Sequence, residues 1–264
     1  MQDNQAFRAL FTLPPIQPSS STALSVPEMP EPKVVTGDKE IDAVLWLQEC
    51  VRTGHPALIE TAMEAAKRIT TPMKTIGDRY AQYLMRQTKG NGFFAALGSM
   101  GFGELESQAK GAIKRQEERH AALSRFGTKE ALLADTPAES ACEKALLGLR
   151  RKKTLLYRYD EGQALKRFIK TPDLVALTLA DCLHAQNYWD QLYSLRCPFD
   201  ECGDPQPEGS AHDDYCFGQM AAIKPRSEQE AVAVLTYLEE KEHMDRNETF
   251  SILRNLISGG WHEA

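Results

Sequence analysis

The sequence predicts a mainly α-helical fold, a multi-helix bundle with one irregular zinc-knuckle-like loop inserted between core helices. Apolar residues recur at helical spacing in several segments, and capping residues followed by proline or glutamate precede many of them. No segment is rich in strand-forming residues, and no internal repeat stands out. The chain has 264 residues, 42% hydrophobic and 26% charged, enough for one large or two modest cores.

Residues 1–37 are predicted to form a disordered tail. They hold six of the 14 prolines and a run of serine and threonine, a composition that buries little apolar surface. Within this tail, Phe7, Leu10 and Phe11 follow the i, i+3, i+4 spacing of one helical face. Such a short apolar segment can dock as a helix into a groove of a protein partner, or it can pack back on its own domain.

Residues 38–125 are predicted to form an N-terminal helical subdomain. Asp38 is placed to cap a first helix, Pro56 to start a second, and Thr71-Pro72 to start a third that runs to about Gln87. A long, charged helix follows from residue 104 to about 123. Short connections favour an antiparallel arrangement of the first three helices.

A glycine-rich segment at 90–103 interrupts this helical pattern. Its five glycines alternate with large apolar side chains, namely Phe93, Phe94, Leu97, Met100 and Phe102. One interpretation is a mobile apolar flap that meets a partner or a bilayer surface. We favour the other, a buried turn whose glycines permit close packing.

Residues 126–264 are predicted to form a C-terminal helical subdomain. Thr136 and Glu139 make a capping box at the start of one helix, and Thr171 is placed to start a helix that runs to Tyr193 in the core. Ser227 starts a further helix, and a last helix ends at the glycines 259–260. This last pair has helix-turn-helix lengths, but it carries few cations, which favours a plain helical hairpin.

The loop 197–216 carries a pattern of metal ligands. Cys197 and Cys202 form a C-x4-C pair, and His212 and Cys216 form an H-x3-C pair, with nine residues between them. Two chelating pairs of this kind suit one tetrahedral Zn²⁺, and four protein ligands make a closed, structural site. The residues between the pairs are turn formers that cannot build a core of their own, so a metal would order them. Unliganded reduced thiols and a disulfide are the alternatives.

Other features limit the functional classes. The usual zinc hydrolase and deaminase motifs are absent, and no spacing places a nucleophile, a base and an orienting group together, so an enzyme is the least favoured of three functional classes, after a nucleic-acid-associated protein and an adaptor. The first residues lack the pattern of a signal peptide, and no apolar run reaches about 18 residues. We therefore expect a cytoplasmic protein without a membrane span, in which metal binding is favoured over disulfides.

The charge distribution points to a polyanionic partner. Residues 150–170 contain eight basic residues against Asp160 and Glu161, a net charge of +6, so that a chain with a total of −6 carries −12 elsewhere. The basic residues are Arg150, Arg151, Lys152, Lys153, Arg158, Lys166, Arg167 and Lys170. Cations of this kind bind phosphates, and the interleaved Tyr157, Tyr159 and Phe168 could stack on bases. The alternative is a solvated basic surface whose aromatics belong to the core.

These observations favour a zinc-stabilised, nucleic-acid-associated protein with a regulatory or accessory role, such as DNA binding in transcription regulation. The alternative is a protein–protein adaptor that uses its helical scaffold and the motif of Phe7, Leu10 and Phe11. The local excess of +6 decides between them, because an adaptor does not require a concentrated positive field.

Overall fold

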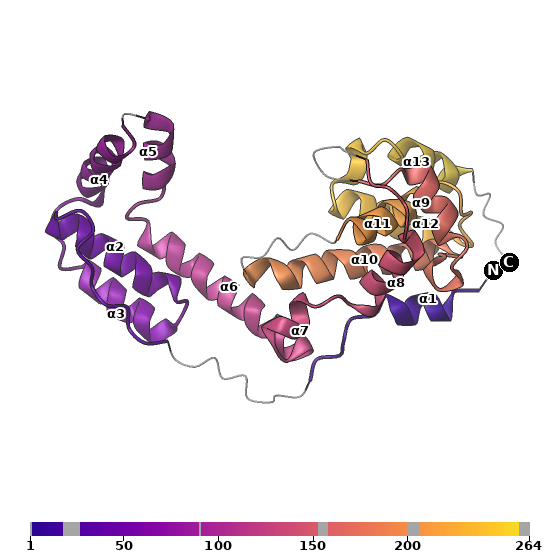
Figure 1. Ribbon diagram of the computed structural model, residues 1–264, viewed down its shortest axis with the longest axis horizontal. Helices are drawn as coiled ribbons and strands as arrows, with labels where there is room; N and C mark the ends of the chain where they lie inside the picture. Colours follow the sequence, from indigo (N-terminus) through magenta and orange to yellow (C-terminus); the bar gives the residue numbers. More distant parts are fainter. Residues whose placement is uncertain (1, 18–26, 90, 153–157, 200–205, 259–264) are drawn as a thin grey trace. The chain divides into compact units, whose positions relative to one another are not determined.

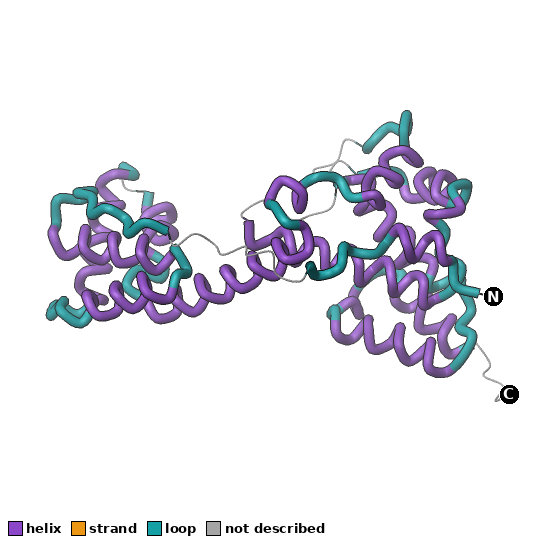
Figure 2. Tube along the Cα trace, turned by 90° about the horizontal axis from the view of Figure 1, so that it is seen from below, coloured by secondary structure: helices purple, strands orange, loops and turns teal. Residues whose placement is uncertain are grey.

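The computed structural model describes residues 2–17, 27–89, 91–152, 158–199 and 206–258. All regular secondary structure in these ranges is helical, with no strand, as Figure 2 shows, which confirms the mainly α class. The chain divides into two compact units, a smaller one of residues 19–124 and a larger one of residues 1–18 and 125–264 (Figure 1). No helix within the described ranges is long and apolar enough to cross a bilayer.

Five helices form the smaller unit. They are α2 (Lys39–Arg52), α3 (Pro56–Ala66), α4 (Met73–Gln87), α5 (Gly92–Ser99) and α6 (Leu105–Phe126), of which residues 105–124 belong to this unit. The side chain of Asp38 caps α2, as predicted, by accepting hydrogen bonds from two backbone amides. Gly54, with a φ of +70°, lets the loop before α3 approach α6, because a Cβ there would lie 2.8 Å from the carbonyl oxygen of Ala112.

The start of α4 differs from the expected capping by Thr71. The N-cap is Pro72, without a side-chain hydrogen bond, and the Thr71 hydroxyl instead donates to Oε1 of Glu40 on α2 at 2.6 Å. Glu40 also forms an ion pair with Arg79 of α4. The hydrogen bonds from Thr71 and Arg79 lower the pKa of Glu40 below its usual value. The Thr71 hydroxyl therefore connects the start of α4 to α2 instead of capping α4.

The glycine-rich segment is a helix rather than a buried turn. Its residues 92–99 form α5, which packs on α4 where Gly98 meets Leu84; a Cβ on Gly98 would lie 2.9 Å from Cδ1 of Leu84. Glycine therefore permits the close approach that the sequence predicted at this point. The large side chains Phe93 and Phe94 nevertheless lie on the surface, because α5 buries only Ala95.

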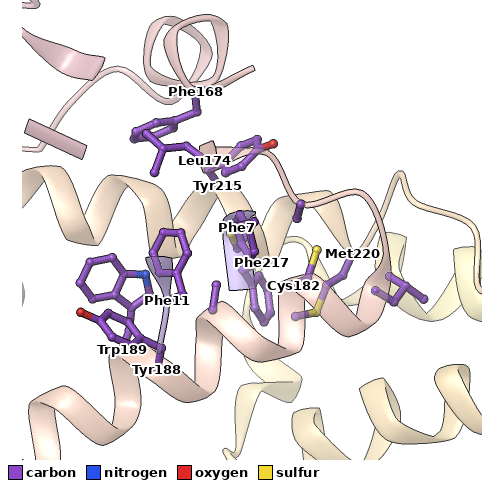
Figure 3. Close-up of a cluster of buried hydrophobic side chains, with 14 of the residues drawn as sticks. Phe7, Phe11, Phe168, Leu174, Cys182, Tyr188, Trp189, Tyr215, Phe217 and Met220 are labelled. Atoms are coloured by element: carbon purple, nitrogen blue, oxygen red, sulfur yellow. The ribbon is translucent and has the colours of Figure 1, made fainter. Parts of the chain in front are cut away.

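The larger unit contains eight helices and three short 3₁₀ turns within the described ranges. The helices are α1 (Gln5–Leu10), α7 (Lys129–Leu133), α8 (Pro137–Leu146), α9 (Glu161–Phe168), α10 (Leu179–Arg196), α11 (Pro207–Gln219), α12 (Glu228–Glu240) and α13 (Thr249–Ile257). The turns are η1 (Pro172–Leu174), η2 (Cys197–Phe199) and η3 (His243–Asp245). Helix α10 is central, since it packs against α1, α7, α11 and α12, and the core around it is rich in aromatic side chains (Figure 3).

A buried ion pair joins α8 to the end of α10. The predicted capping box of Thr136 and Glu139 is present, and Arg196 donates to both carboxylate oxygens of Glu139, at 2.6 and 2.9 Å. Burial alone would raise the pKa of Glu139, but the hydrogen bonds from Arg196 and Thr136 lower it. Arg196 also donates to the carbonyl oxygens of Leu132 and Ala134, so that the buried guanidinium is well satisfied.

The N-terminal segment differs from the expected disordered tail. Residues 5–10 form α1, which Asn4 caps, and Phe7 and Phe11 are 0% and 1% exposed in the core of the larger unit. Leu10 is partly buried against the same core. The apolar motif therefore follows the alternative in which it packs back on its own domain. Burying two phenylalanines offsets the entropy lost when a short segment is ordered.

Candidate nucleic-acid interface and predicted metal ligands

The basic stretch surrounds α9 in the larger unit. Seven of its eight cations lie within the described residues, and all seven are exposed: Arg150, Arg151, Lys152, Arg158, Lys166, Arg167 and Lys170. Lys153 lies outside the described residues. The first three follow α8, Arg158 precedes α9, and the remaining three lie in the second half of α9 or just after it.

Three of these cations form ion pairs. Arg151 pairs with Glu208 of α11 at 2.6 Å, Lys152 pairs with Asp160 at 3.0 Å, and Arg158 approaches Asp214 of α11 at 3.9 Å. The hydroxyl of Tyr159 also donates to Glu208. Burial would raise the pKa of Glu208, but the hydrogen bonds from Tyr159 and Arg151 lower it, so the carboxylate stays charged. Two carboxylates of α11 thus neutralise part of the local positive charge.

The other four cations have no carboxylate within ion-pair distance among the described residues: Arg150, Lys166, Arg167 and Lys170. Helix α9 directs Ala164 and Phe168 into the core, which leaves its cations in solvent. A position near the helix C-terminus also stabilises positive charge through the helix dipole. These four side chains are free to contact an external anion.

The aromatic residues of this stretch do not support base stacking. Tyr159 is 8% exposed and Phe168 is fully buried in the core, where its ring meets Tyr215 (Figure 3). The predicted stacking role is wrong for these two residues, and Tyr157 lies outside the described residues. The physical reason is that α9 is amphipathic, and Phe168 follows Ala164 by one helical turn on its buried surface.

The predicted metal ligands occupy different environments. Cys197 is exposed in η2, whereas His212 and Cys216 lie on α11 and are fully buried. Cys202 lies outside the described residues. Within the described ranges, no three histidine, cysteine or carboxylate side chains are grouped so that they could hold a metal ion. The expected irregular loop is helical from residue 207 onward, because Pro207 takes the first position of α11.

His212 lies inside a cage of aromatic rings. Its imidazole stacks on Phe11 with ring centroids 4.6 Å apart and meets Phe168 edge to face at 5.0 Å. Nε2 lies 3.0 Å from the carbonyl oxygen of Leu174, so Nε2 carries the proton and donates it to this oxygen. Burial lowers the pKa of His212 to about 4, despite the opposing effect of this hydrogen bond.

Cys216 is the nearest polar neighbour of His212 on α11. Its Sγ lies 3.7 Å from Nδ1 of His212, the ring nitrogen that is left as an acceptor. Burial raises the pKa of the Cys216 thiol well above its usual value. The pair is therefore a neutral imidazole beside a protonated thiol, and it packs as part of the core.

A cleft that the sequence did not reveal lies beside the basic stretch. It has a volume of about 600 Å³ between α9, α11 and the segment that leads into α13. Its charged lining consists of Glu161, Asp214, Asp245, Glu248, Arg158 and Arg246. Arg246 pairs with Asp214 at 3.0 Å. Because four carboxylates and only two guanidinium groups line it, this cleft is a poor phosphate site.

Comparison with known protein families, curated proteins and solved structures gives no match for this chain. The functional argument therefore depends on the charges and contacts of the chain itself.

Proposed function

We propose that this chain is a nucleic-acid-associated accessory protein that contacts phosphates through Arg150, Lys166, Arg167 and Lys170. The observation that supports this function most directly is that these four cations are exposed and lack carboxylate partners among the described residues. These cations belong to a chain whose net charge is −6. A concentrated positive field on an acidic protein restricts contact with a polyanion to one surface.

The mode of contact that we propose is phosphate binding without base readout. The buried rings of Tyr159 and Phe168 cannot reach a base, and the neighbouring cleft is acidic. Contacts to phosphates fix position but carry no sequence information. Four such contacts to duplex DNA would reduce the affinity roughly 100-fold between 50 and 200 mM salt through counterion release.

The test is binding of labelled duplex DNA and single-stranded RNA, measured by fluorescence anisotropy at these two salt concentrations. The variant R150Q/K166Q/R167Q/K170Q removes the four cations, and we expect it to lose most binding at low salt and most of the salt dependence. The matched control K33Q/K39Q/K110Q/R115Q removes four exposed cations of the smaller unit and the same amount of charge. Equal loss in both variants, or no binding at low salt, would overturn the proposal.

A structural zinc ion is a second part of this proposal. It rests on the spacing of Cys197, Cys202, His212 and Cys216 and on one distance, the 3.7 Å between Nδ1 of His212 and Sγ of Cys216. Two ligands of one tetrahedral zinc lie about 3.5 Å apart, given Zn–N of about 2.0 Å and Zn–S of about 2.3 Å. Exposed Cys197 would have to reach this buried pair.

The zinc proposal is tested by the metal content of the purified protein. We expect one equivalent of zinc in the wild type and its loss, together with thermal stability, in Cys202→Ser. Cys50→Ser is a matched control, because it replaces a buried cysteine of the smaller unit. If the purified wild-type protein contains no zinc, the zinc proposal is wrong. The phosphate-binding surface is tested independently, by the DNA and RNA binding measurements.

A further inference from the structure

The hairpin of α4 and α5 in the smaller unit exposes five large apolar side chains. The exposed fractions are 68% for Phe93, 59% for Phe94, 50% for Leu97, 74% for Met100 and 41% for Met85. The rings of Phe93 and Phe94 contact each other edge to face at 5.8 Å. Cε of Met85 lies 3.5 Å from the place that a Cβ on Gly92 would occupy, so α4 extends the patch. We call these five side chains the apolar tip.

The apolar tip is at the upper end of the apolar patches that a folded monomer exposes. With about 200 Å² for the full surface of a side chain of this size, its exposed fractions amount to roughly 600 Å². Patches of this size on a monomer often bind something. The tip nevertheless falls short of the roughly 800 Å² that each partner buries in a stable protein–protein interface.

The chain segment that carries the apolar tip is cationic. The 25 residues from Arg79 to Gly103 contain no aspartate or glutamate, although 37 carboxylates in 264 residues would place about three or four there. Arg79 is paired with Asp38 and Glu40 of α2. Arg86 and Lys89 are exposed and have no ion pair with a described residue. The tip therefore combines exposed phenylalanines with unpaired positive charge.

We propose that the apolar tip inserts into the interface of an anionic lipid bilayer. Phe93, Phe94 and Met100 would enter the boundary between headgroups and acyl chains, while Arg86 and Lys89 would contact lipid phosphates. Apolar insertion and the attraction of cations to anionic headgroups add to each other, so the combination binds more tightly than either one alone. The binding is peripheral, because α5 has only eight residues.

The charge of the tip also argues against a second copy of the chain as its partner. A two-fold interface brings the same surface of both subunits together, so it would place Arg86 and Lys89 of one copy next to those of the other. Like charges at a small interface oppose association. An anionic surface satisfies the cations and the apolar side chains at the same time.

The experiment is sedimentation of the full-length protein with vesicles of phosphatidylcholine, with and without phosphatidylserine. We expect binding to the anionic vesicles and at least about tenfold weaker binding to the neutral ones. F93S/F94S and R86Q/K89Q should each reduce binding to anionic vesicles about tenfold. Phe250→Ser is the control, because Phe250 is a phenylalanine of the larger unit that is even more exposed, at 77%.

Two further measurements distinguish this proposal from its rivals. The variant R150Q/K166Q/R167Q/K170Q should bind anionic vesicles as the wild type does; if it fails to bind, the basic stretch and not the tip holds the membrane. Light scattering gives the oligomeric state of the wild type and of F93S/F94S. A dimer that F93S/F94S dissociates, or vesicle binding that F93S/F94S leaves unchanged, would overturn the proposal.

Discussion

Two short helical segments of this chain each carry a pair of phenylalanines, and the two pairs have opposite environments. Phe7 and Phe11 of the α1 segment are almost completely buried, whereas Phe93 and Phe94 of α5 are more than half exposed. Helix α1 has six residues and α5 has eight, and the sequence of α5 is the more apolar of the two. Apolar content therefore does not decide which segment is buried.

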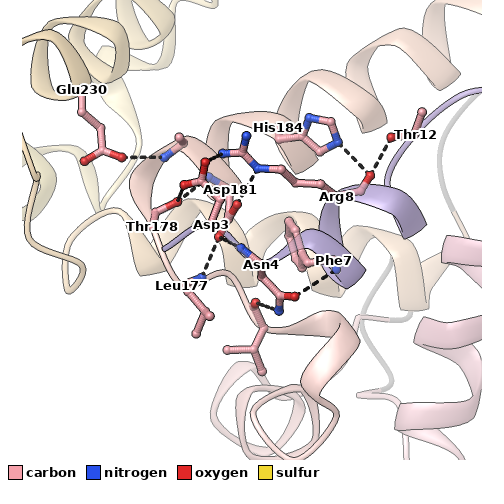
Figure 4. Close-up of polar contacts among 12 residues, drawn as sticks. Asp3, Asn4, Phe7, Arg8, Thr12, Leu177, Thr178, Asp181, His184 and Glu230 are labelled. Carbon is pink, nitrogen blue, oxygen red and sulfur yellow. Dashed lines mark hydrogen bonds and ion pairs between the residues drawn. The ribbon is translucent and has the colours of Figure 1, made fainter. Parts of the chain in front are cut away.

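The difference lies in the surface against which each helix packs. Polar groups fix α1 on α10, since Asp181 accepts hydrogen bonds from Nε of Arg8 at 2.7 Å and from the backbone amide of Asn4 at 3.1 Å (Figure 4). His184 donates to the carbonyl oxygen of Arg8. These contacts hold Phe11 against the ring of His212. Among the described residues, the main contacts of α5 are with α4.

The largest effect that we expect comes from truncating one phenylalanine of each pair. Phe11→Ala should lower the free energy of unfolding by about 3–5 kcal/mol, because it opens a cavity between Tyr188, Trp189 and His212. Phe93→Ala should change it by less than about 0.5 kcal/mol. Urea unfolding followed by tryptophan fluorescence measures the first, and circular dichroism compares both. Similar changes in the free energy of unfolding for the two variants would show that the two phenylalanine pairs do not differ in their contribution to stability.

The second effect is the titration of His212 in the zinc-free protein, where α1 covers the imidazole. A base whose folded-state pKa is lowered, here to about 4 from 6.5, contributes stability above pH 6.5 that is lost as the pH falls toward 4, about 3 kcal/mol in full. We expect the His212 resonance in NMR spectra to remain unchanged from pH 8 to pH 5.5. In Phe11→Ala it should titrate at higher pH, because water reaches the ring. An unaltered titration in that variant would show that Phe11 does not protect the imidazole.

The third effect concerns the carboxylate that anchors α1. Asp181→Asn should lower the free energy of unfolding by about 2–3 kcal/mol, because Asp181 is fully buried and both its oxygens accept hydrogen bonds. Chemical unfolding measures the loss, and the exposed carboxylate Asp78→Asn serves as the control. Proteolysis at the N-terminus should also become faster in Asp181→Asn. Equal stability of the two variants would mean that packing alone holds α1.

The smallest effect extends the comparison to Asp213, the neighbour of His212 in sequence. Burial, and then the charge of Asp214, raise the pKa of Asp213 to about 7. An acid with a raised folded-state pKa binds more protons when folded, so its contribution to stability falls as the pH rises from about 4 to 7. Asp213→Asn should therefore become more stable than the wild type over this range, by about 1–2 kcal/mol at pH 8, since the side chain is only half-buried.

The control for this prediction is the same pair of proteins at pH 4. There the charge of Asp213 should contribute little to the difference between their free energies of unfolding. Asn at position 213 can still accept the hydrogen bond from Nε2 of Gln186 that Oδ1 of Asp213 accepts at 2.7 Å. A difference that stays constant with pH would show that Asp213 keeps its charge throughout. Between pH 4 and 6.5 the effects of His212 and Asp213 oppose each other, so the wild-type profile alone would conceal both.

The helical class and several helix starts were predictable from the sequence. Asp38, Thr136 and Ser227 cap their helices, each through a hydrogen bond to an amide three or fewer residues away. The expected start at Thr171 was incorrect: a 3₁₀ turn occupies residues 172–174, and Thr178 caps α10 instead. Threonine is a common capping residue, so the local sequence alone did not distinguish Thr171 from Thr178.

For the candidate interface, the sequence indicated the positive charge but not how much of it is free. Glu208 and Asp214, which neutralise Arg151 and Arg158, lie more than 50 residues further along the chain. The buried position of Phe168 likewise depends on Tyr215 and His212, which approach it from α11. Charge is a property of composition, whereas ion pairing requires two elements to be brought together.

What the sequence by itself determined is therefore the local part of this protein: its helical class, many of its helix starts and the excess of cations between residues 150 and 170. Only the tertiary structure decided that Phe7 and Phe11 are buried while Phe93 and Phe94 are exposed. Capping and helical periodicity act between residues a few positions apart, so they can be read along the chain. Burial depends on whether another element offers a surface of matching shape and satisfies the polar groups beside it, and that is settled only when distant segments meet.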